Sequence, residues 1–242
     1  MKISNRMKKY LVSFVFIPLL FNLILIGCYF SGIDFLQQII APTVEGLASN
    51  AWREFGLLEQ LQNLLLLAVV VILALSTKNM NSVLDRALLI GATLAFLFLF
   101  LEEIDYGIHY YELFIGENTG IEVRNWHNQK TNGEQNVKKL KQLVDVLMFL
   151  LFIVLPLVKN KISVPFIQNI APSRWFIAGF AVSLSCSNFA HFLDDQGLGI
   201  IAMQEGNLTG NISEFRELSN YYFFMLYALQ LHKLESLFRR NR

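Results

Sequence analysis

Long apolar runs separated by shorter polar stretches dominate the chain, and this pattern predicts helices that cross a membrane. A membrane-spanning helix needs about 20 mostly apolar residues. Segments that meet or approach this length are 10–30, 57–76, 84–101, 143–158, 175–193 and 218–237. We therefore expect an all-α fold, a polytopic membrane helix bundle of about six spans, in which residues 1–242 form a single integral membrane domain.

The composition agrees with this pattern. The chain is 54% hydrophobic and only 16% charged, with a mean hydropathy of +0.44, whereas soluble domains are usually about 25% charged. Its 20 Lys and Arg nearly balance 19 Asp and Glu, so the net charge of +1 leaves no electrostatic case for a nucleic acid partner. We expect the chain to lie in the lipid bilayer. Cys28 and Cys186 both lie in apolar runs, which is typical of buried small hydrophobic residues.

The distribution of Lys and Arg predicts the orientation, because basic residues in short loops resist translocation. With the N-terminus in the cytoplasm, the outer side keeps seven basic residues and the inner side thirteen. We therefore expect an N-in, C-in topology. The inner residues are Lys2, Arg6, Lys8, Lys9, Lys78, Arg86, Lys159, Lys161, Arg174, Lys233, Arg239, Arg240 and Arg242.

The loops expected on the outer side are long, at about 31–56, 102–142 and 194–217. Long loops in a compact protein are more often functional than idle. The stretch from Trp52 to Phe55 is amphipathic with an aromatic anchor, and a second amphipathic stretch covers about 134–143. We expect both to be interfacial helices at the outer surface.

Acidic residues and a histidine follow the third predicted span. If that helix continues, Glu102, Asp105, Tyr106 and His109 fall on one side of it at about 100° per residue, whereas Glu103 points elsewhere. A carboxylate and an imidazole one turn apart can reach one metal ion or share one proton.

Similar residues occur at the outer ends of other spans. His191 and Asp194 end the fifth span, Glu217 opens the sixth, and His127 lies in the second outer loop. The expected topology brings all of them to one membrane boundary. Because ionisable residues near the bilayer are costly, their convergence predicts a functional site.

An alternative explanation is open for each cluster taken alone. Helix ends at the headgroup level routinely carry polar residues, and Asp194 can simply begin a solvated loop. Glu214 and Glu217 have a further explanation, because negative charge in the first turn of a helix is favoured by the helix dipole.

Three short motifs resemble those of a loose group of uncharacterised bacterial multi-pass membrane proteins. That group carries an E-E-[IL]-[SD]-[WY]-G motif at the end of a span, then N-x-H-N, then a last span that opens with acidic residues. The matching stretches here are Glu102–Gly107, Asn125–Asn128 and Glu214–Leu218. The resemblance covers about half of the chain. It implies a bacterial inner-membrane protein and names no reaction.

A second, weaker resemblance is to membrane hydrolases of the alkaline ceramidase and adiponectin-receptor type. Those enzymes use a Ser-x-x-x-His element, an Asp and further histidines to hold zinc. Ser187 and His191 fit the element by their spacing. This resemblance implies a zinc-dependent hydrolase.

The first functional hypothesis is a metal-dependent hydrolase or transferase that acts on a lipid or lipid-linked substrate at the outer leaflet. Three ligands and an open position on a divalent metal such as zinc let a bound water ionise near neutral pH. The candidate general bases are Glu103 and Glu217. The candidate metal ligands are Glu102, Asp105, His109, His127, His191 and Asp194.

Two other functions stay open. The acids can form the cation or proton site of a transporter or channel, although such sites usually lie near the bilayer midplane within inverted repeats. The polar residues can instead be interhelical hydrogen bonds and caps of a non-catalytic membrane assembly protein.

Overall fold

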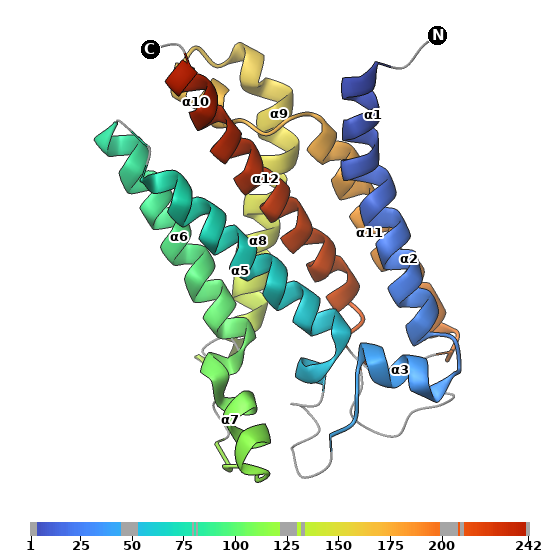
Figure 1. The fold of residues 1–242 in the computed structure, drawn as a ribbon. Coiled ribbons are helices and arrows are strands. Elements are labelled where there is room, and N and C mark those ends of the chain that lie inside the picture. The colour runs from blue at the N-terminus through green and yellow to red at the C-terminus, as the bar shows by residue number, and fades with distance from the viewer. Residues whose placement is uncertain are drawn as a thin grey trace. The chain divides into compact units, whose positions relative to one another are not determined.

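The computed structural model describes residues 4–44, 53–78, 80, 82–121, 130–131, 134–198, 208 and 211–240, which are almost entirely helical (Figure 1). The first half contains α1 (Asn5–Leu11), η1 (Val12–Phe16), α2 (Ile17–Tyr29), α3 (Asp34–Ile40), η2 (Arg53–Phe55), α5 (Leu57–Thr77), α6 (Val83–Glu103), η3 (Asp105–Gly107) and α7 (Ile108–Ile115). The second half contains β1 (Lys130–Thr131), β2 (Glu134–Gln135), α8 (Asn136–Phe149), η4 (Leu150–Val154), α9 (Leu155–Val158), η5 (Lys159–Lys161), α10 (Pro165–Ile170), α11 (Trp175–Asp195) and α12 (Glu214–Arg240). The two short strands pair antiparallel.

Within the described residues, 5 helices are long and apolar enough to cross a membrane by length and composition. They are Met7–Tyr29, Leu57–Thr77, Val83–Glu103, Leu143–Lys161 and Trp175–Asp195, and they coincide with the first five predicted spans. The sixth predicted span lies within α12, which is helical throughout but is not among the five. The chain is therefore an all-helical protein with multi-pass membrane character.

Helical residues occur in both segments that were predicted to be interfacial, and their place at a membrane surface stays a prediction. The end of the first, Arg53–Phe55, is the short 3-10 helix η2. The second overlaps α8, which begins at Asn136.

The chain divides into two compact units, which are described separately below. The first comprises Met1–Leu64, Gly107–Ile121 and Ala178–Tyr222. The second comprises Leu65–Tyr106, Glu122–Ile177 and Phe223–Arg242. That the whole chain forms a single membrane domain stays a prediction.

Prolines shape two of the candidate spans. Pro18 has no backbone N–H, and its ring would clash with the carbonyl group four residues earlier in a regular α-helix. The wider π-helical turn η1 ends two residues before Pro18, and η4 likewise ends two residues before Pro156. Both spans thus absorb their proline by locally widening the helix.

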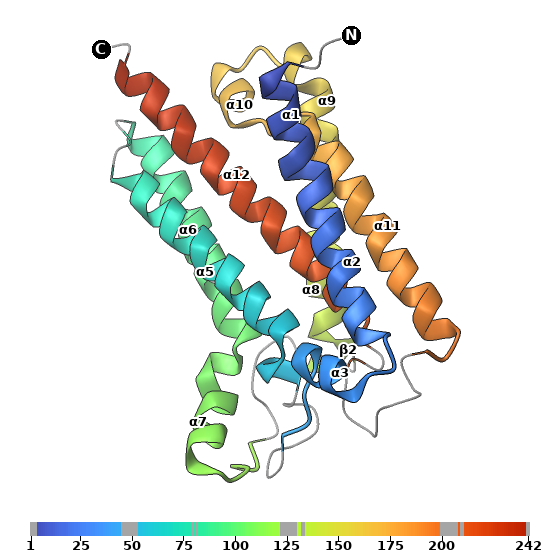
Figure 2. The ribbon, with the colours of Figure 1, turned by 45° about the vertical axis from the view of Figure 1, so that its right-hand side comes forward.

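In the first unit, α2 packs antiparallel against the first two turns of α12. The contacting residues run in opposite order along the two helices, which fixes the antiparallel direction. α11 lies beside α2 in both ribbon views (Figures 1 and 2). The contacts between α2 with its preceding π-turn and α12 are the hydrogen bond from the Tyr222 hydroxyl to the Ser13 carbonyl (2.9 Å), the hydrogen bond from Asn22 to Ser219 (2.9 Å) and the edge-to-face rings of Tyr29 and Phe215.

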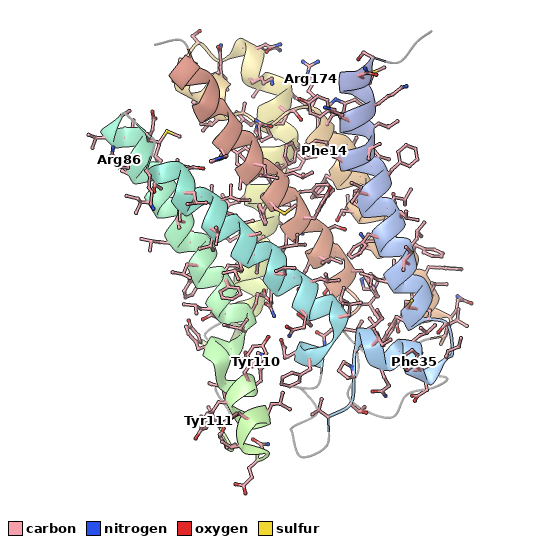
Figure 3. All side chains as sticks on the ribbon, viewed as in Figure 1. Phe14, Phe35, Arg86, Tyr110, Tyr111 and Arg174 are labelled. Carbon is pink, nitrogen blue, oxygen red and sulfur yellow. The ribbon has the colours of Figure 1, made fainter. Side chains whose placement is uncertain are left out.

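In the second unit, the end of α5 and the start of α6 form a hairpin that packs against α12. Its buried apolar residues are Val69, Leu73, Leu89 and Ala228. Stacked rings of Phe152 and Phe176, with centroids 4.8 Å apart, extend this core. Arg86 and Arg174 both lie at the upper end of this unit in Figure 3.

The expected continuation of α6 past Glu103 is wrong. The helix ends there, and Asp105 (φ 49°), Tyr106 (φ 52°) and Gly107 (φ 85°) all adopt left-handed backbone conformations. Such conformations cost about 1 to 3 kcal/mol for residues with side chains. Because the helix restarts only at Ile108, the helical alignment of Glu102, Asp105 and His109 does not exist.

Candidate functional site

The residues predicted to form one site are divided between the two units. Glu102, Glu103 and Asp105 belong to the second unit, whereas His109, His191, Asp194 and Glu217 belong to the first. His127 lies outside the described residues. The candidate residues are therefore described within each unit.

In the second unit, Glu102 and Asp105 are buried and Glu103 is half-buried. The hydroxyl of Tyr106 donates a hydrogen bond to the Glu102 carboxylate. This hydrogen bond, with smaller contributions from burial and from the negative charge of Glu102, raises the pKa of Tyr106 to about 12. The pair thus ties the left-handed turn to the end of α6.

In the first unit, His109 lies on α7 and is completely buried. Its ring meets that of Phe55 edge-on, with centroids 5.4 Å apart, and lies 4.2 Å from the ring of Tyr110. Gln60 Nε2 donates hydrogen bonds to the Tyr110 hydroxyl (2.8 Å) and to the Glu54 carbonyl (2.7 Å). We call Glu54, Phe55, Gln60, His109, Tyr110 and Glu112 the α7 site.

Glu112 lies one turn after His109 on α7 and is also completely buried. Its Oε1 accepts hydrogen bonds from the backbone N–H (3.0 Å) and the hydroxyl (2.7 Å) of Thr119. Gly116 ends α7 in a left-handed conformation (φ 71°), which turns the chain back. The Glu112 carboxylate thus holds the segment after α7 against the buried face of that helix.

The remaining histidine candidate of the first unit has a different environment. His191 is exposed on α11 and Asp194 is half-buried, whereas Ser187, four residues before His191, is buried. Glu217, in the first turn of α12, is half-buried. Among the residues that the structure describes, no three His, Cys, Asp or Glu side chains lie together in a way that can hold a metal ion.

A second polar cluster in the first unit was not expected from the sequence. Gln62 Nε2 donates to the backbone carbonyl (3.1 Å) and to the carboxylate (3.2 Å) of Glu214. Asn22 Nδ2 donates to the Pro18 carbonyl (2.8 Å) and to the Ser219 hydroxyl (2.9 Å). We call Asn22, Gln62, Glu214 and Ser219 the amide cluster.

The hydrogen bonds determine the orientation of both amides. A carbonyl oxygen accepts but cannot donate, so the NH₂ group of each amide must face it. The opposite atoms, Asn22 Oδ1 and Gln62 Oε1, then have no hydrogen-bond partner in the described part of the chain. Both side chains are at most 2% exposed, so the cluster presents buried acceptor oxygens.

A signal for this cluster exists in the sequence. Glu59, Gln62 and Asn63 are spaced i, i+3 and i+4 in an otherwise apolar run, which places them on one helix face. All three are buried on α5. Polar residues on one face of a membrane helix indicate contact with another helix or with a polar site.

Comparison with known proteins finds no match among family models, curated proteins or solved structures. The chemistry of the site is therefore inferred from its own residues.

Proposed function

We propose that this chain is an integral membrane enzyme that hydrolyses, or transfers a group of, a lipid or lipid-linked substrate at the membrane boundary. The observation that carries the proposal is the complete burial of His109 and Glu112 on one face of α7. Burying an imidazole and a carboxylate is costly, so such groups are retained where they serve a function. Histidine is also the side chain best suited to acid–base catalysis near neutral pH.

The position of the α7 site supports an action at the boundary. Gln60, which holds Tyr110, lies in the first turn of the candidate span Leu57–Thr77. Phe55, which contacts His109, directly precedes that span. A reacting group beside His109 would thus sit at the level where lipid headgroups meet the hydrocarbon.

The roles within the proposed reaction follow from burial. His109 is the proton-transfer residue, and Glu217, which belongs to the same unit and is half-buried, is the candidate general base. A divalent metal such as zinc, with His109 among its ligands, stays part of the proposal. Elemental analysis of the purified protein tests whether a metal is bound. A stoichiometric amount of metal supports the metal-dependent form of the proposal, and a folded sample without metal would contradict it.

The proposed topology has six spans with both termini in the cytoplasm of a bacterial cell, α12 as the sixth span and the α7 site on the extracytoplasmic side of the inner membrane. In the second unit, Arg86 and Arg174 share one end, as the excess of cytoplasmic Lys and Arg requires (Figure 3). The acidic Glu102 and Glu103 close the opposite end of α6.

The amide cluster favours an ion- or proton-coupled transporter as the second candidate. Asn22 lies seven positions before Tyr29, the end of its span, and Gln62 five positions after Leu57, the start of its span. At 1.5 Å per residue, Asn22 lies roughly 10 Å and Gln62 roughly 8 Å inside its span, where oxygen ligands can bind a cation.

Turnover of defined lipids tests the proposal against this alternative. The full-length protein is incubated in nanodiscs that contain phosphatidylethanolamine, phosphatidylglycerol and a polyprenyl-phosphate-linked sugar, and the products are followed by mass spectrometry. The proposal expects a water-soluble headgroup product or a transferred group that heat-denatured protein does not form. Absence of any product, together with cation or proton flux in proteoliposomes, would establish the transporter instead.

A further inference from the structure

The helix that carries His109 has two chemically distinct faces. His109 and Glu112 are completely buried, whereas Tyr111 is 58% exposed, Phe114 88% and Ile115 40%. Tyr111, Phe114 and Ile115 are spaced i, i+3 and i+4, so they form one face opposite the buried pair. The exposed face of α7 is therefore apolar and carries no charge.

The same division occurs on α3. Gln37 and Ile40 are buried, whereas Phe35 is 70% exposed and Ile39 is 40% exposed. Phe35 and Ile39 are one turn apart on the face opposite Gln37. The one charged residue of α3 is Asp34, at the first position of the helix.

Hydrogen bonds hold both helices at the ends of candidate spans. Gln37 Nε2 donates to the carbonyl of Tyr29 (2.7 Å), the last residue of the span Met7–Tyr29. Gln60, in the first turn of the span Leu57–Thr77, donates to the hydroxyl of Tyr110 on α7 (2.8 Å). Within the first unit, α3 and α7 lie at the same end in Figures 1 and 2, and Figure 3 labels Phe35 and Tyr111.

We propose that the exposed faces of α3 and α7 lie in the lipid headgroup and upper acyl region of the membrane and bind lipid directly. Apolar faces rich in aromatic residues are typical of helices that lie in the membrane interface. Hydrogen bonds join both helices to the ends of candidate spans, and such spans themselves contact lipid, which favours lipid over a protein partner as the occupant. We call them the lipid-facing surface.

This surface would hold lipid on the face of α7 opposite His109. A lipid that contacts Phe114 on the outer face of α7 is one helix diameter from the buried face that carries His109. The inference that this lipid includes the substrate rests on the proposed function. The lipid contact itself does not require any enzymatic activity.

Depth measurements in nanodiscs test the lipid-facing surface. Phe114→Cys and, as a matched control, Asn118→Cys are made in a Cys28→Ala, Cys186→Ala background and spin-labelled. Asn118 is exposed and polar and follows α7 by three positions. We expect the label at 114 to be shielded from an aqueous nickel relaxation agent and accessible to lipid-soluble oxygen, and the label at 118 to show the reverse.

Equal accessibility of both labels to the aqueous agent would overturn the proposal. If the cysteine-free background does not fold, Phe114→Trp in the natural background replaces it, with quenching by brominated lipids measured relative to wild type. Extra quenching supports lipid contact, and none contradicts it. If position 114 contacts lipid but the protein turns over no lipid, the lipid-facing surface is supported and only the proposed enzymatic function is contradicted.

Discussion

Asn22 shows how a single polar residue can join distant parts of a membrane protein. It lies within an apolar span, donates to the carbonyl of Pro18 four residues earlier in its own helix, and donates also to Ser219. Ser219 lies in a helix almost at the other end of the chain. The hydrocarbon region contains no water that could hydrogen-bond to such a side chain, so its donors bond to other groups of the protein.

A double-mutant cycle measures the bond between Asn22 and Ser219. We expect the Asn22→Ala and Ser219→Ala substitutions to be coupled by about 0.6 kcal/mol, and by at most about 2 kcal/mol, as for other interhelical bonds in membranes. Unfolding in mixed detergent micelles gives the free energies. Ser185→Ala is the control partner, because Ser185 is exposed and bonds within its own helix. Equal coupling in the two cycles would mean that the interhelical bond does not form.

The Tyr106–Glu102 pair makes a prediction about pH. The pKa of Tyr106 is about 12 because its hydroxyl donates to the carboxylate, and Glu102→Gln should bring this pKa down toward the usual 10. The folded-state value exceeds the unfolded one, so the contribution of the pair to stability is complete below about pH 10 and disappears as the pH rises toward 12. It is small, since Tyr106 is about half exposed.

Phenolate absorbance between pH 9 and 13 checks this pKa. The spectrum of Tyr106→Phe is subtracted from that of the parent protein to isolate the one phenol, and the same subtraction is made in the Glu102→Gln background. A Tyr106 midpoint that is unchanged by the Glu102→Gln substitution would exclude the carboxylate as the cause.

At the scale of elements, the apolar runs predicted the bounds of the five candidate spans to within three residues, because length and hydrophobicity alone define a span. The break after α6 could not be predicted in the same way. Tyr106 has no sequence signal for a left-handed backbone, whereas Gly107 and, to a lesser degree, Asp105 are residue types that adopt one. The wrong assumption of a continuous helix then placed Glu102 and His109 on one face.

The link between α5 and α7 can be tested by hydrogen exchange. Gln60→Leu removes the bond to Tyr110, so we expect amides of residues 108–115 to exchange about 2- to 10-fold faster, which corresponds to about 0.5 to 1.5 kcal/mol. Gln168→Leu is the matched control, because Gln168 also donates to a backbone carbonyl, that of Ile162, in the second unit. Equal acceleration of α7 by both variants would contradict the proposed link.

At the scale of the whole molecule, the sequence predicted the membrane character but not the amide cluster. Charged residues at span ends are readily recognised as candidate site residues, whereas Asn22 and Gln62 are neutral residues within apolar runs. Their importance depends on contacts with α12, more than 150 positions away along the chain. Packing across such separations is not encoded in local periodicity, which explains why this part of the first unit was missed.

The proposed orientation predicts where the C-terminus lies. A green fluorescent protein fused after Arg242 should fluoresce, because it folds in the cytoplasm, and alkaline phosphatase at the same position should be inactive. Thirteen of the basic residues lie on the cytoplasmic side in this topology. An active phosphatase fusion together with a non-fluorescent green fluorescent protein fusion would contradict the proposed orientation.

The most direct test of the central claim is the rate at which His109→Ala turns over the lipid that wild type converts. General acid–base catalysis contributes about 100- to 10 000-fold, so we expect a loss of at least about 100-fold in a variant that still elutes as a folded protein. His232→Ala is the control, because this histidine belongs to the second unit and bonds to Ser76 (2.9 Å). It should keep the wild-type rate. A folded His109→Ala variant with the wild-type rate would contradict the assignment of proton transfer to the α7 site.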